Sequence, residues 1–326
     1  MKTREKVLSK LYKNREILSG EQIAKELGLS RNSVWKAINS LKEDGYKIIS
    51  ASDGYRLEIC DKFDSYAIRQ YLKREHSLHI YKEEGSSNTV AKFLCQEGEG
   101  EGSVVIVESQ TAGRGRMGRS FISNSENGLY MSIILRPTIP ADRCVNITVM
   151  AAVAVTQAIE RTSGVDCGIK WVNDIYINDR KCAGILTEAS IDFEGGVVQY
   201  AIVGIGVNLC PPKNGFPKEI EEIACGVYEK EAPSGYKARL CAEIINEFFD
   251  LYSGLEDKEY LDKYKEKSII IGKEVDMYVS QNVMSGTAVD IDENANLVIR
   301  DSQGKLHTFN SGDARVRHAF DKRGIK

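Results

Sequence analysis

The chain has 326 residues, of which 42% are hydrophobic and 28% are charged, and its formal net charge at pH 7 is −3. At roughly 100 to 200 residues per domain, this length predicts two or three domains. The composition is typical of ordered proteins with sizeable cores, and it excludes disorder, a collagen-like chain and a stapled mini-protein.

The sequence carries no signal for a membrane or for export. No window approaches the roughly 20 apolar residues of a bilayer-spanning helix, and the amino terminus lacks the uninterrupted apolar core of a signal peptide. The eight cysteines form no Cys-x-x-Cys pair, and the four histidines are equally dispersed. We therefore expect free thiols, no structural metal and a cytoplasmic protein.

Three helices are predicted at the amino terminus. The first has apolar residues at helical spacing, and the segment Ser19-Gly20-Glu21-Gln22 then has the form of a capping box. The second helix breaks at Gly28, and Ser30 caps a third helix whose apolar stripe begins at Val34. Two helices joined by a short turn with glycine are typical of the helix-turn-helix motif.

The third helix and a hairpin after it favour DNA as the partner. Residues 46–50 and 54–58 predict two strands, which would form a wing. The first 60 residues hold 12 Lys and Arg against 8 Asp and Glu, a modest surplus that is by itself often just a solvated surface. A three-helix bundle without DNA is the alternative. The candidate DNA-contacting side chains are Arg31, Asn32, Ser33 and Lys36, with Asn39 beside them.

A second domain begins near residue 64, with a helix predicted over 65–75 and alternating strands and helices after it. The strand predicted at 103–107 leads into Gly113-Arg114-Gly115-Arg116-Met117-Gly118-Arg119. This has the Gly-x-Gly-x-x-Gly spacing of a dinucleotide site, but turn-forming residues follow where that site needs a helix. We reject the dinucleotide interpretation and expect a loop whose arginines surround a phosphorylated ligand.

Two further segments are candidates for the same site. Residues 169–176 and 180–186 predict strands joined by a tight Asn178-Asp179 turn, so a hairpin would bring Asp174 and Lys181 together. A structural ion pair is the alternative interpretation of that pair. An apolar strand over 197–203 ends in Gly204-Ile205-Gly206-Val207-Asn208, where the glycines permit close approach by a ligand.

Short strand signals then dominate the carboxyl-terminal part. They lie at 273–280, 286–292, 297–301 and 305–310, and the segment 311–316 follows them. Strands of this length and spacing predict a small SH3-like β-barrel.

Together these motifs resemble the biotin protein ligases, specifically the bifunctional biotin operon repressors that join a winged helix to a ligase. The resemblance covers essentially the whole chain. It depends most on GRGRMGR at 113–119, with support from KWVNDIY at 170–176, RKCAGIL at 180–186 and GIGVN at 204–208. It implies a multidomain α+β protein: a winged helix-turn-helix domain at 1–62, an α/β ligase domain with a mixed sheet at 63–268, and an SH3-like domain at 269–326.

The resemblance implies an ATP-dependent ligase. Biotin and ATP, with Mg²⁺, would give biotinyl-5′-adenylate, and the biotinyl group would pass to a lysine of a biotin carboxyl carrier protein of acetyl-CoA carboxylase or a related carboxylase. The chain has no Met-Lys-Met acceptor of its own. Adenylate would also favour a homodimer that binds the operator DNA of biotin genes.

Site residues follow from the resemblance by position in this sequence. The expected catalytic residues are Lys181, Arg116 and Asp174, of which Asp174 would orient or deprotonate the incoming amine. The expected biotin-binding residues are Ser86, Ser87, Asn88, Gln110, Arg114, Gly115, Arg116, Lys181, Gly184, Gly204 and Gly206. The expected residues for ATP and adenylate are Arg116, Arg119, Phe121, Asn173, Lys181 and Asn208.

Two residues depart from the family pattern. Phe121 stands where the family often has Trp, and Val172 replaces the usual Pro between Trp171 and Asn173. Phe121 keeps an aromatic group over the ligand. The residue that stacks on adenine is not assigned, and Phe216 is only a guess.

Three alternatives stay open. One is a monofunctional biotin ligase with a vestigial DNA-binding head, and another is a transcription factor that senses a small molecule. Lys181 and Arg116 argue against the sensor, because sensing alone does not require them. The third is a lipoate ligase of related fold, against which the complete GRGRMGR loop and the winged helix argue.

Overall fold

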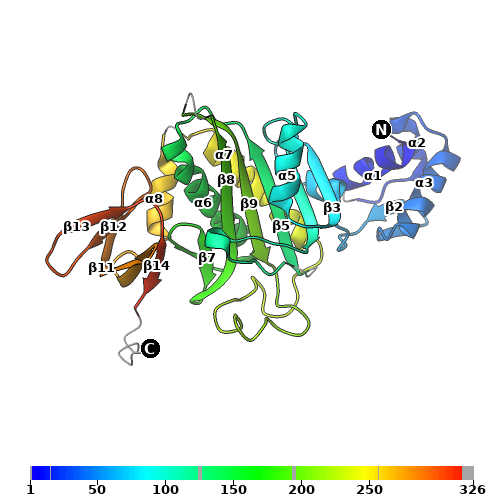
Figure 1. Cartoon of the computed structure of the whole chain (residues 1–326). Coiled ribbons are helices and arrows are strands. Elements are labelled where there is room, and N and C mark those ends of the chain that lie inside the picture. The colour runs from blue at the N-terminus through cyan, green and yellow to red at the C-terminus, as the bar shows by residue number, and fades with distance from the viewer. Residues whose placement is uncertain (1, 15, 124–126, 193–195, 256, 318–326) are drawn as a thin grey trace. The chain divides into compact units, whose positions relative to one another are not determined.

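The chain is represented by a computed structural model that describes residues 2–14, 16–123, 127–192, 196–255 and 257–317 (Figure 1). Its internal contacts form two compact units. The first consists of Met1–Glu75 and Ala232–Glu243, and the second of His76–Glu231 and Ile244–Lys326. Among the described residues, no helix is long and apolar enough to cross a membrane.

The first unit begins with the predicted helices α1 (Thr3–Lys13), α2 (Gly20–Leu27) and α3 (Arg31–Glu43). Local capping signals set their limits. The Ser19 side chain accepts a hydrogen bond from the backbone N–H of Gln22 at 3.0 Å, and Ser30 caps α3 in the same way. The left-handed conformation of Gly28 ends α2.

A hairpin completes the winged helix. Strand β1 (Ile48–Ala51) pairs antiparallel with β2 (Gly54–Leu57), and the backbones of Leu18 and Tyr55 exchange two hydrogen bonds that hold the hairpin against the chain before α2. The core under the three helices is fully buried and apolar, with members such as Val7, Ile23, Val34, Ile38 and Leu41. The predicted winged helix-turn-helix fold is therefore present.

Two local predictions for this unit need correction. The side chain of Gln22 donates to Glu26 instead of closing the reciprocal half of a capping box. The helix predicted over 65–75 is shorter, because α4 spans only Ser65–Arg69 and buries only Ala67 and Ile68. The charged residues 73–75 continue no apolar stripe that would extend it.

The second unit is built on a seven-stranded mixed sheet in the order β3-β4-β5-β9-β8-β7-β6. Only β3 and β4 pair in parallel, and every other neighbouring pair is antiparallel. Its strands are β3 (Leu78–Glu84), β4 (Val104–Gln110), β5 (Gly128–Leu135), β6 (Gly168–Lys170), β7 (Asp174–Ile177), β8 (Arg180–Ile191) and β9 (Val198–Asn208). The expected mixed sheet of the ligase domain is therefore present.

The segment predicted as one strand over 169–176 is two strands. Lys170 of β6 pairs with Asp174 of β7, so the three residues between them form a turn. The Trp171 indole N–H donates to the carbonyl of Ala295, and Asn173 Nδ2 donates to the carbonyl of Ile185. Trp171 and Asn173 thus bond to partners outside the β6–β7 strand pair. A pattern of strand-forming residues does not predict these distant partners. The Trp171–Val172 peptide bond is cis.

Helices cover both faces of this sheet (Figure 1). Helix α5 (Ser87–Gln96) packs Ala91 against Ile202 of β9, whereas α6 (Cys144–Ser163) reaches the opposite face, where Thr148 donates to Thr187 at 2.7 Å. The faces are distinct because Ile202 pairs with Glu188, and Thr187 points the other way. Two further helices are α7 (Tyr236–Tyr252) and α8 (Glu259–Glu266).

The carboxyl-terminal part of the second unit is an antiparallel sheet in the order β13-β12-β11-β10-β14. Within the described residues β13 and β14 do not pair, so the strand ladder is not closed as the predicted SH3-like barrel requires. The strands are β10 (Glu274–Val279), β11 (Asn282–Ile291), β12 (Leu297–Arg300), β13 (Leu306–Phe309) and β14 (Asp313–Val316).

Candidate functional site

A cleft lies in the second unit, on the face of the sheet that carries α5. Six segments line it: the start of α5, the end of β4, the glycine-arginine loop, the turn before β7, strand β8 and strand β9. Its lining residues are Ser86, Ser87, Asn88, Gln110, Arg114, Gly115, Arg116, Phe121, Asn173, Lys181, Gly184, Ile185, Leu186, Gly204, Ile205 and Gly206. Every residue expected to bind biotin is among them.

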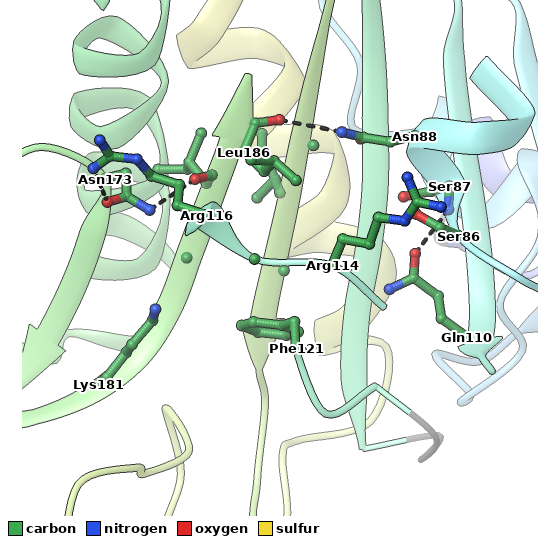
Figure 2. A pocket seen from close by; sticks show the side chains of 16 residues that line it. Ser86, Ser87, Asn88, Gln110, Arg114, Arg116, Phe121, Asn173, Lys181 and Leu186 are labelled. Atoms are coloured by element: carbon green, nitrogen blue, oxygen red, sulfur yellow. Dashed lines mark hydrogen bonds between the residues drawn. The ribbon is translucent and has the colours of Figure 1, made fainter. Parts of the chain in front are cut away.

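One wall of the cleft is rich in neutral hydrogen-bonding groups, and the Arg114 side chain lies beside them (Figure 2). The Gln110 carbonyl oxygen accepts the backbone N–H of Ser87 at 2.7 Å. Ser86, Ser87 and Gln110 are all buried. Since the Ser87 N–H and the Gln110 oxygen satisfy each other, the Gln110 amide N–H groups and the Ser86 hydroxyl are available to a polar ligand edge.

Three glycines form the floor. Gly184 and Gly206 are directly paired across β8 and β9, and Gly204 lies two residues along the same face. A Cβ on Gly204 would lie 2.2 Å from Asn88 Oδ1, and a Cβ on Gly206 would lie 2.6 Å from the Phe121 ring. We expected these glycines to leave space for the ligand. They also leave space for side chains of the site itself.

The glycine-arginine loop folds back on itself. Gly115 N–H donates to the Arg119 carbonyl at 2.7 Å, and Phe121 N–H donates to the Gly113 carbonyl at 3.0 Å. Between them Arg116–Gly118 is a short 3₁₀ turn, and extended backbone follows at Arg119. The rejection of a dinucleotide-binding helix at this loop is confirmed.

Arg116 is fixed on the side of the cleft opposite the serines (Figure 2). Its Nη1 donates to Asn173 Oδ1 at 3.1 Å, while Asn173 Nδ2 donates to the Ile185 carbonyl at 2.8 Å. Burial lowers the pKa of Arg116, and nearby Asp174 and Asp313 oppose that shift. A guanidinium stays protonated at neutral pH under such conditions, so Arg116 is a partly desolvated cation aimed at the cleft.

Lys181 supplies a second cation at this end. Its Nζ lies 2.6 Å from Asp174 Oδ1, as the predicted hairpin requires, and 6.0 Å from the centre of the Phe121 ring. Asp174 is not among the residues that line the cleft, so it stands behind Lys181. Phe121 lies on the floor between Lys181 and Gln110 (Figure 2).

Arg119 is directed away from the cleft lining and toward the carboxyl-terminal sheet. Its Nη2 donates to Asp313 Oδ2 at 2.8 Å, and Lys170 and Arg315 also lie near that carboxylate. Burial would raise the pKa of Asp313, but the hydrogen bond from Arg119 and these cations outweigh it and lower the pKa. Sequence reasoning missed Asp313, because its partner lies 194 residues away.

The expected nucleotide residue Asn208 and the guessed adenine-stacking residue Phe216 lie elsewhere. Asn208 Nδ2 donates to the Cys225 carbonyl and ties the end of β9 to the following loop. Phe216 lies in that loop, partly exposed, and does not line the cleft. Sequence reasoning also missed three apolar lining residues, Ile185, Leu186 and Ile205, since they read as ordinary strand positions.

The candidate DNA-contacting residues lie on α3 in the first unit. Arg31, Asn32 and Lys36 are exposed and Ser33 is partly exposed, while Val34 and Ile38 face the core. Trp35 is also 53% exposed on this helix. The polar face is therefore accessible to a ligand.

Comparison with known proteins agrees with both units. The model of the Biotin/lipoate A/B protein ligase family matches residues 83–208, a helix-turn-helix domain model matches 3–56, and the biotin protein ligase C-terminal domain model matches 270–317. The "Bifunctional ligase/repressor BirA" of Bacillus subtilis is 35% identical over 89% of this chain and 91% of its own length. The protein of the same name from Escherichia coli is 25% identical over 95% and 96%.

A solved structure shares the fold of most of this chain. Biotin protein ligase from Aquifex aeolicus, in complex with biotin and ATP, superposes with a TM-score of 0.61 at 23% identity. The match covers 74% of this chain and 99% of that one.

Proposed function

This chain belongs to the biotin protein ligases of the bifunctional ligase/repressor type, and from that membership we propose that its cleft binds biotin and ATP to make biotinyl-5′-adenylate. The biotinyl group then passes to a lysine of a biotin carboxyl carrier protein, of acetyl-CoA carboxylase or a related carboxylase. The observation that supports this most is the polarity of the cleft. The neutral hydrogen-bonding groups beside Arg114 at one end suit the polar edge of a ring system, and Arg116 and Lys181 at the other end suit a carboxylate beside a phosphate.

In the first step a carboxylate oxygen of biotin attacks the α-phosphorus of ATP. A new O–P bond forms, the bond to the β-phosphate breaks, and pyrophosphate leaves. Two anions must approach each other, so Arg116 and Lys181 act by offsetting that repulsion and holding the reactants in line. The hydrogen bond from Arg116 to Asn173 fixes the guanidinium before the ligands arrive.

In the second step the neutral amine of the acceptor lysine attacks the carbonyl carbon of the adenylate. The C–O bond to the phosphate breaks and AMP leaves. Asp174 orients the amine and accepts the proton that its nitrogen loses. The ion pair with Lys181 compensates the charge of the Asp174 carboxylate, which lies behind Lys181 at the edge of the cleft.

In the proposed reaction, Mg²⁺ would be bound together with ATP. Among the described residues, no group of three or more His, Cys, Asp or Glu side chains could hold a metal ion by itself. The carboxylate beside the cleft is Asp174, and this fits Mg²⁺, which is typically held by one or two carboxylates together with substrate phosphates and water. When bound, the ion would neutralise phosphate charge.

We also propose that the chain represses biotin genes as a homodimer on operator DNA, with biotinyl-adenylate as corepressor. The complete capped helix-turn-helix supports this over a vestigial head, since α3 presents basic and short polar side chains to solvent. The identity of the relatives favours biotin over lipoate.

Five finer assignments belong to the same proposal. The domain limits are 1–62, 63–268 and 269–326, the carboxyl-terminal sheet is an SH3-like module that assists carrier docking, and the protein works in the cytoplasm. The loop from Gly113 to Phe121 closes over the adenylate, and Arg119 and Asn208 help to hold its phosphate or adenine end.

The test is to incubate the purified chain with biotin, ATP and Mg²⁺ and to assay biotinyl-adenylate by mass spectrometry and pyrophosphate by a coupled assay. We expect both products in equal amounts, and neither when biotin is omitted. Pyrophosphate without biotinyl-adenylate, or neither product from folded protein, would overturn the ligase assignment.

A further inference from the structure

The side chain of Asn88 is engaged entirely by the protein. Its Nδ2 donates both to the Leu186 carbonyl at 3.2 Å and to Glu188 Oε2 at 2.7 Å. Its Oδ1 accepts the Ser132 hydroxyl at 2.6 Å. Both amide N–H groups are thus used, and reversing the amide would set its N–H groups against the hydroxyl donor and its oxygen against two acceptors.

These bonds fasten the start of α5 to two strands of the sheet. Ser132 lies on β5 and Glu188 on β8. In the sequence, Ser132 is 44 residues from Asn88 and Glu188 is 100 residues from it. Ser132 Oγ also lies 2.8 Å from Ser87 Oγ, one residue before Asn88. The close approach of Asn88 to Gly204 shows that the packing here leaves no spare room.

Glu188 is itself held by a cation. Lys92, one turn along α5 from Asn88, donates to Glu188 Oε1 at 2.5 Å, while Oε2 accepts from Asn88. Burial would raise the pKa of Glu188, but the hydrogen bonds from Lys92 and Asn88 together with Arg114 outweigh it and lower the pKa. Glu188 is therefore a carboxylate at neutral pH, and its two oxygens serve two residues of one helix.

We infer that Glu188, with Lys92 and Ser132, is a positioning residue for the wall of the ligand cleft that Ser86, Ser87 and Gln110 form. Glu188 acts through its hydrogen bond with Asn88, and the position of Asn88 sets the positions of Ser86 and Ser87. This deepens the proposed function, on which it rests, because the ligand at that wall is the ring system of biotin. Neither Glu188 nor Lys92 lines the cleft, so their effect on the ligand is indirect.

The inference predicts a selective defect. In Glu188→Ala, Asn88 loses its charged acceptor and the start of α5 becomes free to shift. We expect the Kd for biotin, measured by titration calorimetry without ATP, to rise about ten- to a hundredfold. The KM for ATP, measured at saturating biotin, should stay within about twofold of the wild-type value, since the cationic end is untouched.

Two conservative variants separate positioning from loss of fold. Glu188→Gln keeps an oxygen for Asn88 Nδ2, so we expect it to recover most of the biotin affinity lost in Glu188→Ala. Lys92→Met removes the cation but not the acceptor, and we expect an intermediate Kd. If Glu188→Ala does not fold, Lys92→Met decides, and a wild-type biotin Kd in Lys92→Met would overturn the inference.

A matched ion pair provides the control. Lys267 Nζ lies 2.6 Å from Glu160 with side-chain exposures of 31% and 25%, close to the 34% and 26% of Lys92 and Glu188. Glu160→Ala should leave the biotin Kd unchanged. The inference is overturned if Glu188→Ala binds biotin like the wild type, or if it raises the biotin Kd and the ATP KM equally. If the wild type itself binds no biotin, the proposed function is the statement that fails.

Discussion

Lys181 is the residue on which the chemistry of the cleft depends most. It lies on β8 between Asp174 and Phe121, where one ammonium can face both a carboxylate and a phosphate. A charge in a partly desolvated site stabilises developing negative charge more than the same charge does in water. The ion pair with Asp174 also fixes where that ammonium lies.

Replacing Lys181 by Ala should lower the rate of adenylate formation about 10²- to 10³-fold. The fold should persist, because the Lys181 side chain is one-third exposed. Pyrophosphate release at saturating substrates measures the effect. Lys267→Ala, which removes a similarly exposed paired lysine far from the cleft, is the control. Equal rates in Lys181→Ala and the wild type would remove Lys181 from the mechanism.

Gly204 tests the packing of the floor. A methyl group there would lie 2.2 Å from Asn88 Oδ1, so Gly204→Ala must displace the Asn88 side chain. We expect the free energy of unfolding to fall by about 1 to 3 kcal/mol and biotin binding to weaken. Gly100→Ala, where a Cβ meets nothing within 4 Å, should change neither. Chemical denaturation and calorimetry measure both quantities, and a neutral Gly204→Ala would show that the floor adapts.

Among the elements, local signals predicted those whose limits are set by neighbouring residues. Ser19, Gly28 and Ser30 mark helix ends by short-range hydrogen bonds, and the Asn178-Asp179 turn places Lys181 beside Asp174. The sequence could not predict the sheet order or the split between β6 and β7. Those depend on partners distant in sequence, such as Ala295 for Trp171.

The contact between the glycine-arginine loop and β14 gives a pH dependence. Asp313 has a lowered pKa in the folded chain, so its ion pair with Arg119 stabilises the fold above the ordinary value of 3.8. That stability is lost as the pH falls through the lowered value. Arg119 is 60% exposed, so we expect only about 1 kcal/mol at pH 7.

Urea unfolding of the wild type and Asp313→Asn measures this contribution. The difference should be present at pH 7, shrink as the pH falls below the ordinary carboxyl value of 3.8, and decrease in 1 M salt. A difference in the free energy of unfolding that grows on acidification would contradict the lowered pKa of Asp313.

At the scale of the whole molecule, two separate units serve one proposed regulatory circuit. The unit with α3 offers a cationic helix face, and the unit with the cleft makes the molecule that signals biotin supply. The coupling between them is a free energy, so adenylate should tighten DNA binding to the same extent that DNA tightens adenylate binding.

Lys36→Ala should weaken binding to DNA from the promoters of biotin genes and make the salt dependence shallower by about one counterion. Fluorescence anisotropy of labelled DNA across a salt series measures the slope. Lys305→Ala changes the net charge equally from an exposed turn of the second unit and should leave the slope unchanged. Equal slopes for Lys36→Ala and the wild type would place the interface on another surface.

The most direct test of the central claim follows the complete reaction. The purified chain is mixed with biotin, ATP, Mg²⁺ and the unmodified carrier domain of a biotin-dependent carboxylase, and the intact mass of the carrier is recorded over time. We expect one biotinyl group on one carrier lysine, formed only when biotin and ATP are both present and nearly abolished in Lys181→Ala. An unmodified carrier in the presence of folded wild-type protein, or equal labelling by Lys181→Ala, would contradict the proposed ligase function.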